Sequence, residues 1–223
     1  MIDKSTTRGK HASSWIDVSI PLRTGMAHWP GDPAPRITRA RALERGDAYT
    51  VSLLEMGAHT GTHMDAPAHV IRRGVTIDAM PLDAGVGTAR VIGIRDAVSV
   101  TVRELRPHRI RRGERILFKT RNSLRSRSTD RFRRDFVYIS AEAARYLAER
   151  KVRLVGVDSL SVGGFKKDGV ATHQALLGAG IWIVEGLNLS MLTPGPVDMI
   201  CLPLRLLNAD GAPARAIVRM RRR

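Results

Sequence analysis

The segment from His59 to His69 constrains the fold of this chain more than any other part of the sequence. It reads HTGTHMDAPAH, so three histidines and an aspartate fall within eleven residues. In an extended backbone successive side chains point to opposite faces, so positions 59, 63 and 65 are expected to share one face. Gly61 leaves that face open between two histidines, and a later proline redirects the chain so that His69 approaches the same point. We therefore expect a fold that holds this segment extended and gathers its polar side chains.

The residue types in this segment are typical of a catalytic metal site. Imidazole nitrogens and a carboxylate oxygen are suitable ligands for zinc, manganese or iron. If His59, His63 and Asp65 bind a metal, they leave room for further protein ligands and a water, as a catalytic site requires. A zinc-protease helix is a poor fit, because its motif needs Glu directly after the first histidine and this chain has Thr60.

Two residues far along the chain are candidates for completing the metal site. His173 lies beside an expected helix start at Thr172, and Glu185 ends the apolar strand over residues 181–184. A carboxylate at the end of a buried strand needs a partner, and a metal is one such partner. A salt bridge or a helix cap would satisfy the same residues, and position alone leaves these interpretations open.

Length and composition bound the class of protein. With 223 residues and 43% hydrophobic content, the chain can bury one sizeable core. Its single cysteine, Cys201, lies in an apolar run and is expected to be a buried thiol. Residues 1–14 lack the apolar core of a signal peptide, and no stretch approaches the roughly 18 apolar residues of a membrane helix. We expect a cytoplasmic protein with a flexible polar N-terminus over 1–14, one domain over 15–219 and a basic tail over 220–223.

The net charge of +16 raises the question of nucleic-acid binding. Thirteen of the 37 Lys and Arg residues lie between Arg103 and Arg134, and four more lie in the last five residues. Nucleic-acid binding usually also needs a reading element or interleaved aromatic side chains, and this stretch has only Phe118 and Phe132. We therefore expect a solvated basic surface, with a small molecule as the partner and neither nucleic acid nor a membrane.

The remaining pattern predicts one mixed α/β domain that is rich in strands. Apolar runs of strand length cover residues 16–20, 49–56, 88–94, 115–119, 152–157, 181–184, 197–207 and 214–218. Helices are expected over 101–106 and 140–149, behind Thr101 and Ser140 as N-caps, and over 172–177. Asp210-Gly211 predicts a hairpin turn between the last two strands, and 121–135 is expected to be a long surface loop.

The segment His59–His69 also matches the signature H-x-G-T-H-x-D-x-P-x-H. On this motif the chain resembles the cyclase-like metal-dependent hydrolase family, which includes bacterial kynurenine formamidases and isatin hydrolases. Further stretches that resemble the family are Trp29–Asp32, Leu154–Val162, Thr172–Leu177, Ile183–Leu189, Ile200–Leu206 and Asp210–Arg215. The resemblance covers about residues 15–219. The resemblance therefore identifies the family but does not identify the substrate.

The resemblance implies a fold, a set of ligands and further site residues. The fold would be a single swivelling β/α/β domain with a mixed, barrel-like sheet, usually assembled as a homodimer or larger. Two zinc or manganese ions per subunit would be held by His59, His63 and Asp65 and by Asp65, His173 and Glu185, with Asp65 and Glu185 shared. His69 would be the proton donor and acceptor, and Trp29 would line the substrate pocket. From sequence alone Trp29 fits a half-buried loop anchor equally well.

The implied activity is hydrolysis of carbon–nitrogen bonds other than peptide bonds. An arylformamidase would convert N-formyl-L-kynurenine to L-kynurenine and formate in tryptophan catabolism, with a metal-activated hydroxide and with His69 moving the proton. A close alternative is opening of an isatin-type lactam, a cyclic imide or a lactone on the same site, because the basic loop 121–135 departs from the family pattern. A different class is a basic nucleic-acid-binding protein with a structural metal. The proton carrier beside the ligands argues against it, because a structural metal needs none.

Overall fold

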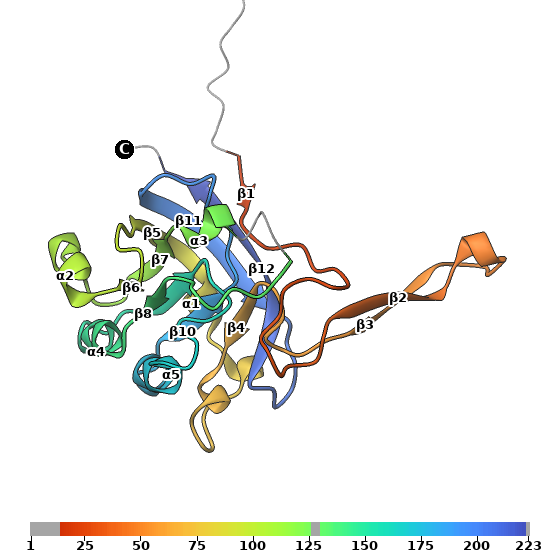
Figure 1. Cartoon of the computed structure of the whole chain (residues 1–223), viewed down its shortest axis with the longest axis horizontal. Coiled ribbons are helices and arrows are strands. Elements are labelled where there is room, and N and C mark those ends of the chain that lie inside the picture. Colours follow the sequence, from red (N-terminus) through yellow and green to blue (C-terminus); the bar gives the residue numbers. More distant parts are fainter. Residues whose placement is uncertain (1–13, 126–129, 222–223) are drawn as a thin grey trace, which may run out of the picture.

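A closed, mixed β-sheet forms the body of the molecule (Figure 1). The computed structural model describes residues 14–125 and 130–221. Its main sheet has the order β1-β12-β11-β5-β7-β9-β10-β4, and β4 also pairs with β12. Seven of these eight strands therefore close into a barrel, and β1 adds to the outside of β12. This confirms the predicted single α/β domain with a barrel-like sheet.

The barrel strands are β4 (His63–Asp65), β5 (Val86–Gly93), β7 (Arg115–Lys119), β9 (Leu154–Val157), β10 (Trp182–Glu185), β11 (Gly195–Pro203) and β12 (Gly211–Met220), with β1 at Ile16–Asp17. The α-helices are α1 (Leu82–Gly85), α2 (Val102–Leu105), α3 (Asn122–Arg125), α4 (Ala141–Glu149) and α5 (Gly169–Gly178). Two small sheets pair β2 (Arg36–Arg41) with β3 (Val51–Glu55) and β6 (Ser99–Val100) with β8 (Tyr138–Ile139). No helix among the described residues is long and apolar enough to cross a membrane.

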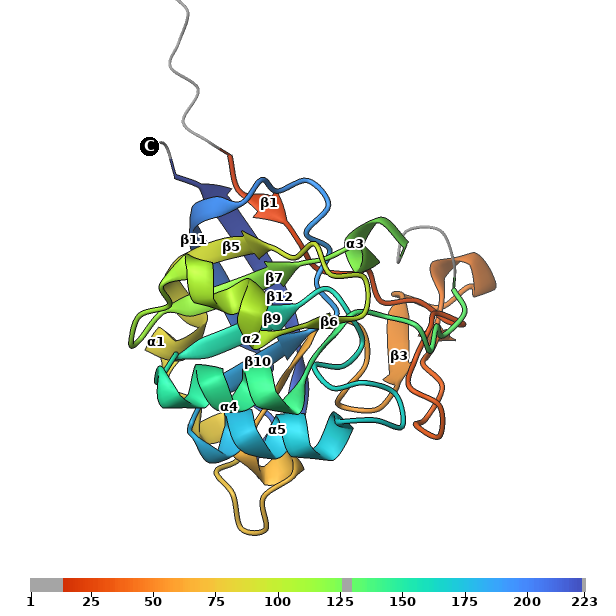
Figure 2. The same ribbon diagram turned by 60° about the vertical axis from the view of Figure 1, so that its left-hand side comes forward.

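Apolar side chains cover both faces of the barrel wall, which explains why its parallel strands read as continuous hydrophobic runs. Strands β9 and β10 are buried along their whole length. One buried cluster takes side chains from all round the ring and includes Met64, Leu117, Val184, Val197 and Val218. A second lies between the outer face and the helices and includes Ile116, Leu147, Val155, Leu176 and Ile183. Figure 2 shows α4 and α5 side by side against this outer face.

Most helices and strands lie where the caps, turns and apolar runs of the sequence predicted them. The Ser140 hydroxyl accepts a hydrogen bond from the Ala143 N–H at 3.1 Å and begins α4, as predicted. Strand β7 has the predicted bounds, and β11 and β12 form the predicted hairpin around Asp210-Gly211. Helix α5 begins at Gly169, three residues earlier than predicted, and α3 interrupts the expected loop 121–135. The predicted polar terminus, except for Ser14, and the last two residues of the basic tail lie outside the described residues.

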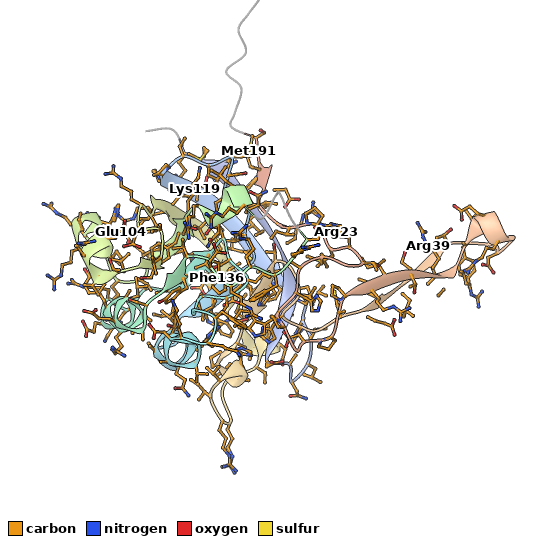
Figure 3. All side chains as sticks on the ribbon, in the orientation of Figure 1. Arg23, Arg39, Glu104, Lys119, Phe136 and Met191 are labelled. Carbon is orange, nitrogen blue, oxygen red and sulfur yellow. The ribbon has the colours of Figure 1, made fainter. Side chains whose placement is uncertain are left out.

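One expectation about backbone path was wrong. The chain is not extended from 59 to 62, because it turns there with Gly61 at φ +65°, and the strand begins only at His63. The strand predicted over 49–56 is present as β3. It pairs with β2 in an arm that projects from the body, and side chains of the arm, such as that of Arg39, stand clear of it (Figures 1 and 3).

Candidate metal centre

The structure brings the predicted metal ligands together on the outer face of the barrel. Strand β4 carries His63 and Asp65, and it pairs antiparallel with β10 so that Glu185 lies opposite His63. Directly opposite residues in a sheet project from the same face. Helix α5 packs on that face and supplies His173, while the turn before β4 supplies His59.

The carboxylates of Asp65 and Glu185 each face more than one imidazole. The His63 Nε2 atom lies 3.3 Å from Asp65 Oδ1 and 3.3 Å from Glu185 Oε2. The His173 Nε2 atom lies 3.2 Å from Glu185 Oε1 and 3.7 Å from Asp65 Oδ2. The His59 Nδ1 atom lies 2.9 Å from Asp65 Oδ1. The atoms of the predicted ligands form two groups that share Asp65, and a third group joins His59 to His69 and Asp210; within each group the atoms lie within 4.8 Å of one another.

The second nitrogen of each ring is held by a hydrogen-bond acceptor. His63 Nδ1 donates to the Gly61 carbonyl at 3.0 Å, and His173 Nδ1 donates to the Gly169 carbonyl at 2.7 Å. His59 Nε2 donates to Asp210 Oδ2 at 2.8 Å. A neutral imidazole that donates through one nitrogen presents a lone pair on the other, and such partners orient the histidines of metal sites. All three rings are therefore turned with one nitrogen toward the shared carboxylates.

Two buried atoms test whether these residues fit a metal ion. His63 Nε2 and Asp65 Oδ2 are buried and have no hydrogen-bond partner among the described residues, although charged neighbours lie within ion-pair distance. Leaving a buried polar group unpaired costs about 1–3 kcal/mol. A divalent cation between the two carboxylates would satisfy both atoms, so the donor set fits a metal.

Burial and the two carboxylates act against each other on the imidazole pKa values. Burial disfavours the charged form of His63, but Asp65 and Glu185 outweigh it and raise the pKa to about 10. Burial likewise disfavours the charged form of His173, and Glu185 together with Asp65 raises its pKa to about 9. Burial alone would raise the pKa of the Asp65 carboxyl, but the adjacent imidazoles of His59 and His63 hold it well below its usual range.

These shifts predict that metal uptake releases protons. Without metal, His63 and His173 are charged at pH 7, since their pKa values lie near 10 and 9. Ligating imidazole must be neutral, so protons compete with the metal and the apparent affinity should rise as the pH rises toward these values. Zinc titration calorimetry in buffers of different ionisation enthalpy should show release of about two protons near pH 7. Zinc binding without proton release would contradict the assignment.

His69 lies at the open side of this cluster. It ends a short 3₁₀ segment, Pro67–His69, and its ring centroid lies 4.1 Å from that of His59 and 5.5 Å from that of His173. Its side chain is 31% exposed, and its Nδ1 lies 3.3 Å from Asp210 Oδ2. Sequence reasoning placed Asp210 only in a hairpin turn and missed these contacts.

Trp29 lies in an aromatic cluster with three phenylalanines. Its ring packs edge-on against Phe132, Phe136 and Phe165, at centroid distances of 5.2, 6.3 and 5.5 Å. Phe132 and Phe136 line a pocket, so Trp29 supports the pocket wall. The sequence could not show this cluster, because Trp29 is more than a hundred residues from the three phenylalanines.

One backbone hydrogen bond and one side-chain approach connect this pocket to the segments of the metal centre. Ser159 lines the pocket, and its carbonyl accepts a hydrogen bond from Gly186, the residue after Glu185, at 2.7 Å. Met26 also lines the pocket and lies 3.4 Å from where a Cβ on Gly61 would stand. The pocket therefore adjoins the segments that hold the histidine and glutamate ligands.

Ion pairs hold the described part of the basic loop over the pocket. Arg23, near the base of the arm in Figure 3, pairs with Asp130. Arg125 and Arg133 each lie 3.0 Å from Asp135. The expected solvated basic surface is therefore, in this part, a paired rim of the pocket.

The chain was then compared with known proteins. Residues 16–163 match the family model described as "Putative cyclase". The kynurenine formamidase of Bacillus cytotoxicus is 35% identical over 208 residues, which cover 93% of this chain and 98% of the relative. The kynurenine formamidase of Salinibacter ruber is 37% identical over 210 residues, covering 92% and 96%.

Solved structures agree with these relatives. A structure described as a potential metal-dependent hydrolase with cyclase activity has a TM-score of 0.83 and 33% identity, and it covers 95% of this chain and 100% of that one. Isatin hydrolase A from Labrenzia aggregata has a TM-score of 0.80 and 26% identity, with 93% of each chain covered. Since the family model matches more than half of the chain and the relatives align over nearly all of it, this chain belongs to the cyclase family of metal-dependent hydrolases.

Proposed function

We propose that this chain is an arylformamidase that hydrolyses N-formyl-L-kynurenine to L-kynurenine and formate. The observation that carries the proposal is the paired ligand cluster around Asp65 with His69 at its open side. A buried cluster of this kind fits hydrolytic chemistry, and the similarity to kynurenine formamidases supports a formamide as the substrate.

The ligand arrangement supports two divalent ions, zinc or manganese, in each subunit. His59, His63 and Asp65 would hold one ion, and Asp65, His173 and Glu185 would hold the other. Glu185 faces both His63 and His173, which suits a shared ligand. When bound, such ions polarise the scissile carbonyl and make water a competent nucleophile near neutral pH.

The protein side chains then handle the proton. His69 takes a proton from the attacking water and returns it to the amine nitrogen as the formamide carbon–nitrogen bond breaks, so the products are formate and the free amine. Its Nδ1 faces Asp210, so the transfer occurs at Nε2. Imidazole suits this role because it takes up and returns protons near neutral pH.

The aromatic pocket supports an aryl substrate, and Trp29 gives a test of it. Trp29→Ala is expected to raise KM about tenfold with little change in kcat, because its edge-on contacts support Phe132 and Phe136 and such contacts contribute about 0.5–1.5 kcal/mol each. Steady-state kinetics measure this change. Trp15→Ala is the control, since Trp15 is exposed and packs on Arg219. Equal KM values for the two variants would remove Trp29 from substrate binding.

The proposed activity is tested directly on purified protein loaded separately with zinc and with manganese. N-formyl-L-kynurenine and isatin are assayed side by side. Metal-dependent turnover of the formamide supports the proposal. Turnover of isatin alone favours the second candidate, an isatin-type lactam hydrolase, which the likeness to isatin hydrolase A supports. Absence of metal binding would overturn both.

We also infer that the chain works as a homodimer joined through its arm. Leu43, Tyr49, Val51, Leu53 and Leu54 are exposed on the arm, where burial by a second copy would stabilise them. Leu53→Asp with Leu54→Asp is expected to weaken the dimer at least about tenfold, since burying a leucine contributes roughly 1.5–3 kcal/mol. Light scattering over a dilution series measures the mass, with Leu207→Asp, exposed outside the arm, as the control. A dimer of unchanged stability in the double variant would show that the arm is not the dimer interface.

We place the reaction in the cytoplasm, as a step of tryptophan catabolism. Cys201 is a free and buried thiol, which suits a reducing compartment where disulfides are rare. Cell fractionation with an antibody to the chain tests the location.

A further inference from the structure

One carboxylate beside the metal centre contacts two histidines of the site, and its effect on them goes beyond the proton transfer described above. Asp210 directly precedes β12, and its Oδ2 atom accepts hydrogen bonds from two histidines. The His59 Nε2 atom lies 2.8 Å from it and the His69 Nδ1 atom lies 3.3 Å from it. The rings of these histidines lie 4.1 Å apart with an angle of 40° between their planes. A single oxygen atom therefore joins a metal ligand of the proposed site to its proton carrier.

The backbone around Asp210 is held against the strand that carries the ligands. The Asp210 carbonyl accepts a hydrogen bond from the Ala66 N–H at 2.9 Å, and Gly211 pairs with Asp65. A Cβ on Gly211 would lie 2.7 Å from His59 Cε1, so the turn approaches the imidazole as closely as glycine allows. The carboxylate is thus placed by the sheet itself, although its side chain is 49% exposed.

We propose that Asp210 is a positioning residue that fixes the ring orientation of both His69 and His59. It keeps the proton of neutral His69 on Nδ1, which leaves the Nε2 lone pair free to take a proton from water. It also turns His59 so that Nδ1 faces Asp65, the shared ligand. The inference rests on the proposed function for the role of His69, but the ring geometry that it describes is independent of the substrate.

The alternative is that Asp210 serves only the hairpin turn, as the sequence predicted. Asparagine is as good as aspartate in such a turn and has nearly the same shape. Asp210→Asn therefore separates the two roles, because it preserves the turn but replaces a carboxylate that accepts two N–H groups. Asp210→Glu restores a carboxylate on a longer side chain.

The experiment compares the wild type with these two variants and with Asp198→Asn, a control for an ion-paired aspartate on β11. Long-range ¹H–¹⁵N spectra of the zinc-loaded protein report which nitrogen of His69 carries the proton. We expect the Nδ1–H form in the wild type and a mixture of forms in Asp210→Asn. Zinc affinity should fall about 10–100-fold in that variant, and kcat should fall by a similar factor while KM changes little. Asp210→Glu should recover part of both losses.

A double variant shows whether Asp210 acts through His69. In a His69→Ala background at saturating zinc, Asp210→Asn should cause no further loss of kcat, because the His69 ring is gone, whereas zinc affinity should still fall through His59. An additive loss, an unchanged His69 spectrum, or unchanged zinc affinity and kcat would overturn the inference. If no formamide is hydrolysed by any form, the proposed function fails, and the spectra and zinc affinities still decide the role of Asp210.

Discussion

His69→Ala is expected to lower kcat for the formamide about 10²–10⁴-fold while the bound metal stays unchanged. Proton transfer by a positioned side chain contributes a factor of this size. His69 stands beside His59 and His173 but outside the two ligand groups that share Asp65, so its loss should leave those groups intact. Steady-state kinetics and metal analysis by atomic emission measure the two quantities on the same sample.

A second histidine provides the matched control for this variant. His108 lies on the short 3₁₀ segment Arg106–His108 after α2, where its carbonyl accepts a hydrogen bond from Arg90, which is not part of the ligand cluster. His108→Ala should keep both kcat and metal content. If His69→Ala lost its metal as well, His69 would belong among the ligands. Full activity without His69 would remove it as the proton carrier.

Asp65→Asn is expected to lose both metal ions and at least about 10³-fold in activity. Asp65 Oδ1 faces His59 and His63, and its Oδ2 faces His173, so both ligand groups depend on this carboxylate. Metal ions contribute several kcal/mol to such reactions, and each 1.36 kcal/mol is a factor of ten in rate. Metal stoichiometry after dialysis, followed by activity at saturating substrate, measures the loss.

The control must show that Asp65→Asn remains folded. Circular dichroism of the metal-free variant provides this, because the network of buried histidines loses a charged partner and some stability. Asp198→Asn, on β11 and ion-paired with Arg219, should keep its metal. Two ions bound to a folded Asp65→Asn protein would be the result that contradicts a shared ligand.

The features predicted correctly from the sequence are those that depend on residues close together in the chain. The ligands of segment 59–69 share a short stretch, so their residue types and spacing indicated a metal. Caps such as Ser140 act within one turn, and the turn Asp210-Gly211 needs only its own residues. His173 and Glu185 were placed in the site through resemblance to the family, since strand-end position alone left a salt bridge equally possible.

The features that the sequence did not predict depend on contacts between distant segments, such as the pairing of strands. Local residue patterns do not show which segments will meet. The alternating residues of β3 read as a strand whether they lie in a barrel or in a projecting arm. The hydrogen bonds of Asp210 to His59 and His69 span more than a hundred residues, as do the ring contacts of Trp29. His59 reaches Asp65 through a turn at Gly61, and only the left-handed backbone there reveals this path.

The three-residue strand β4 also sets the order in which the molecule can be completed during synthesis. It pairs on one edge with β10 and on the other with residues 211–213, so both partners emerge from the ribosome more than a hundred residues later. Until then its backbone groups have no strand partners, and an unpaired edge is open to association with other chains. Pairings this distant in sequence close slowly. The last ligand, Glu185, precedes the final hairpin, so the ligand set is complete in the nascent chain before β12 is made and closes the barrel beside it.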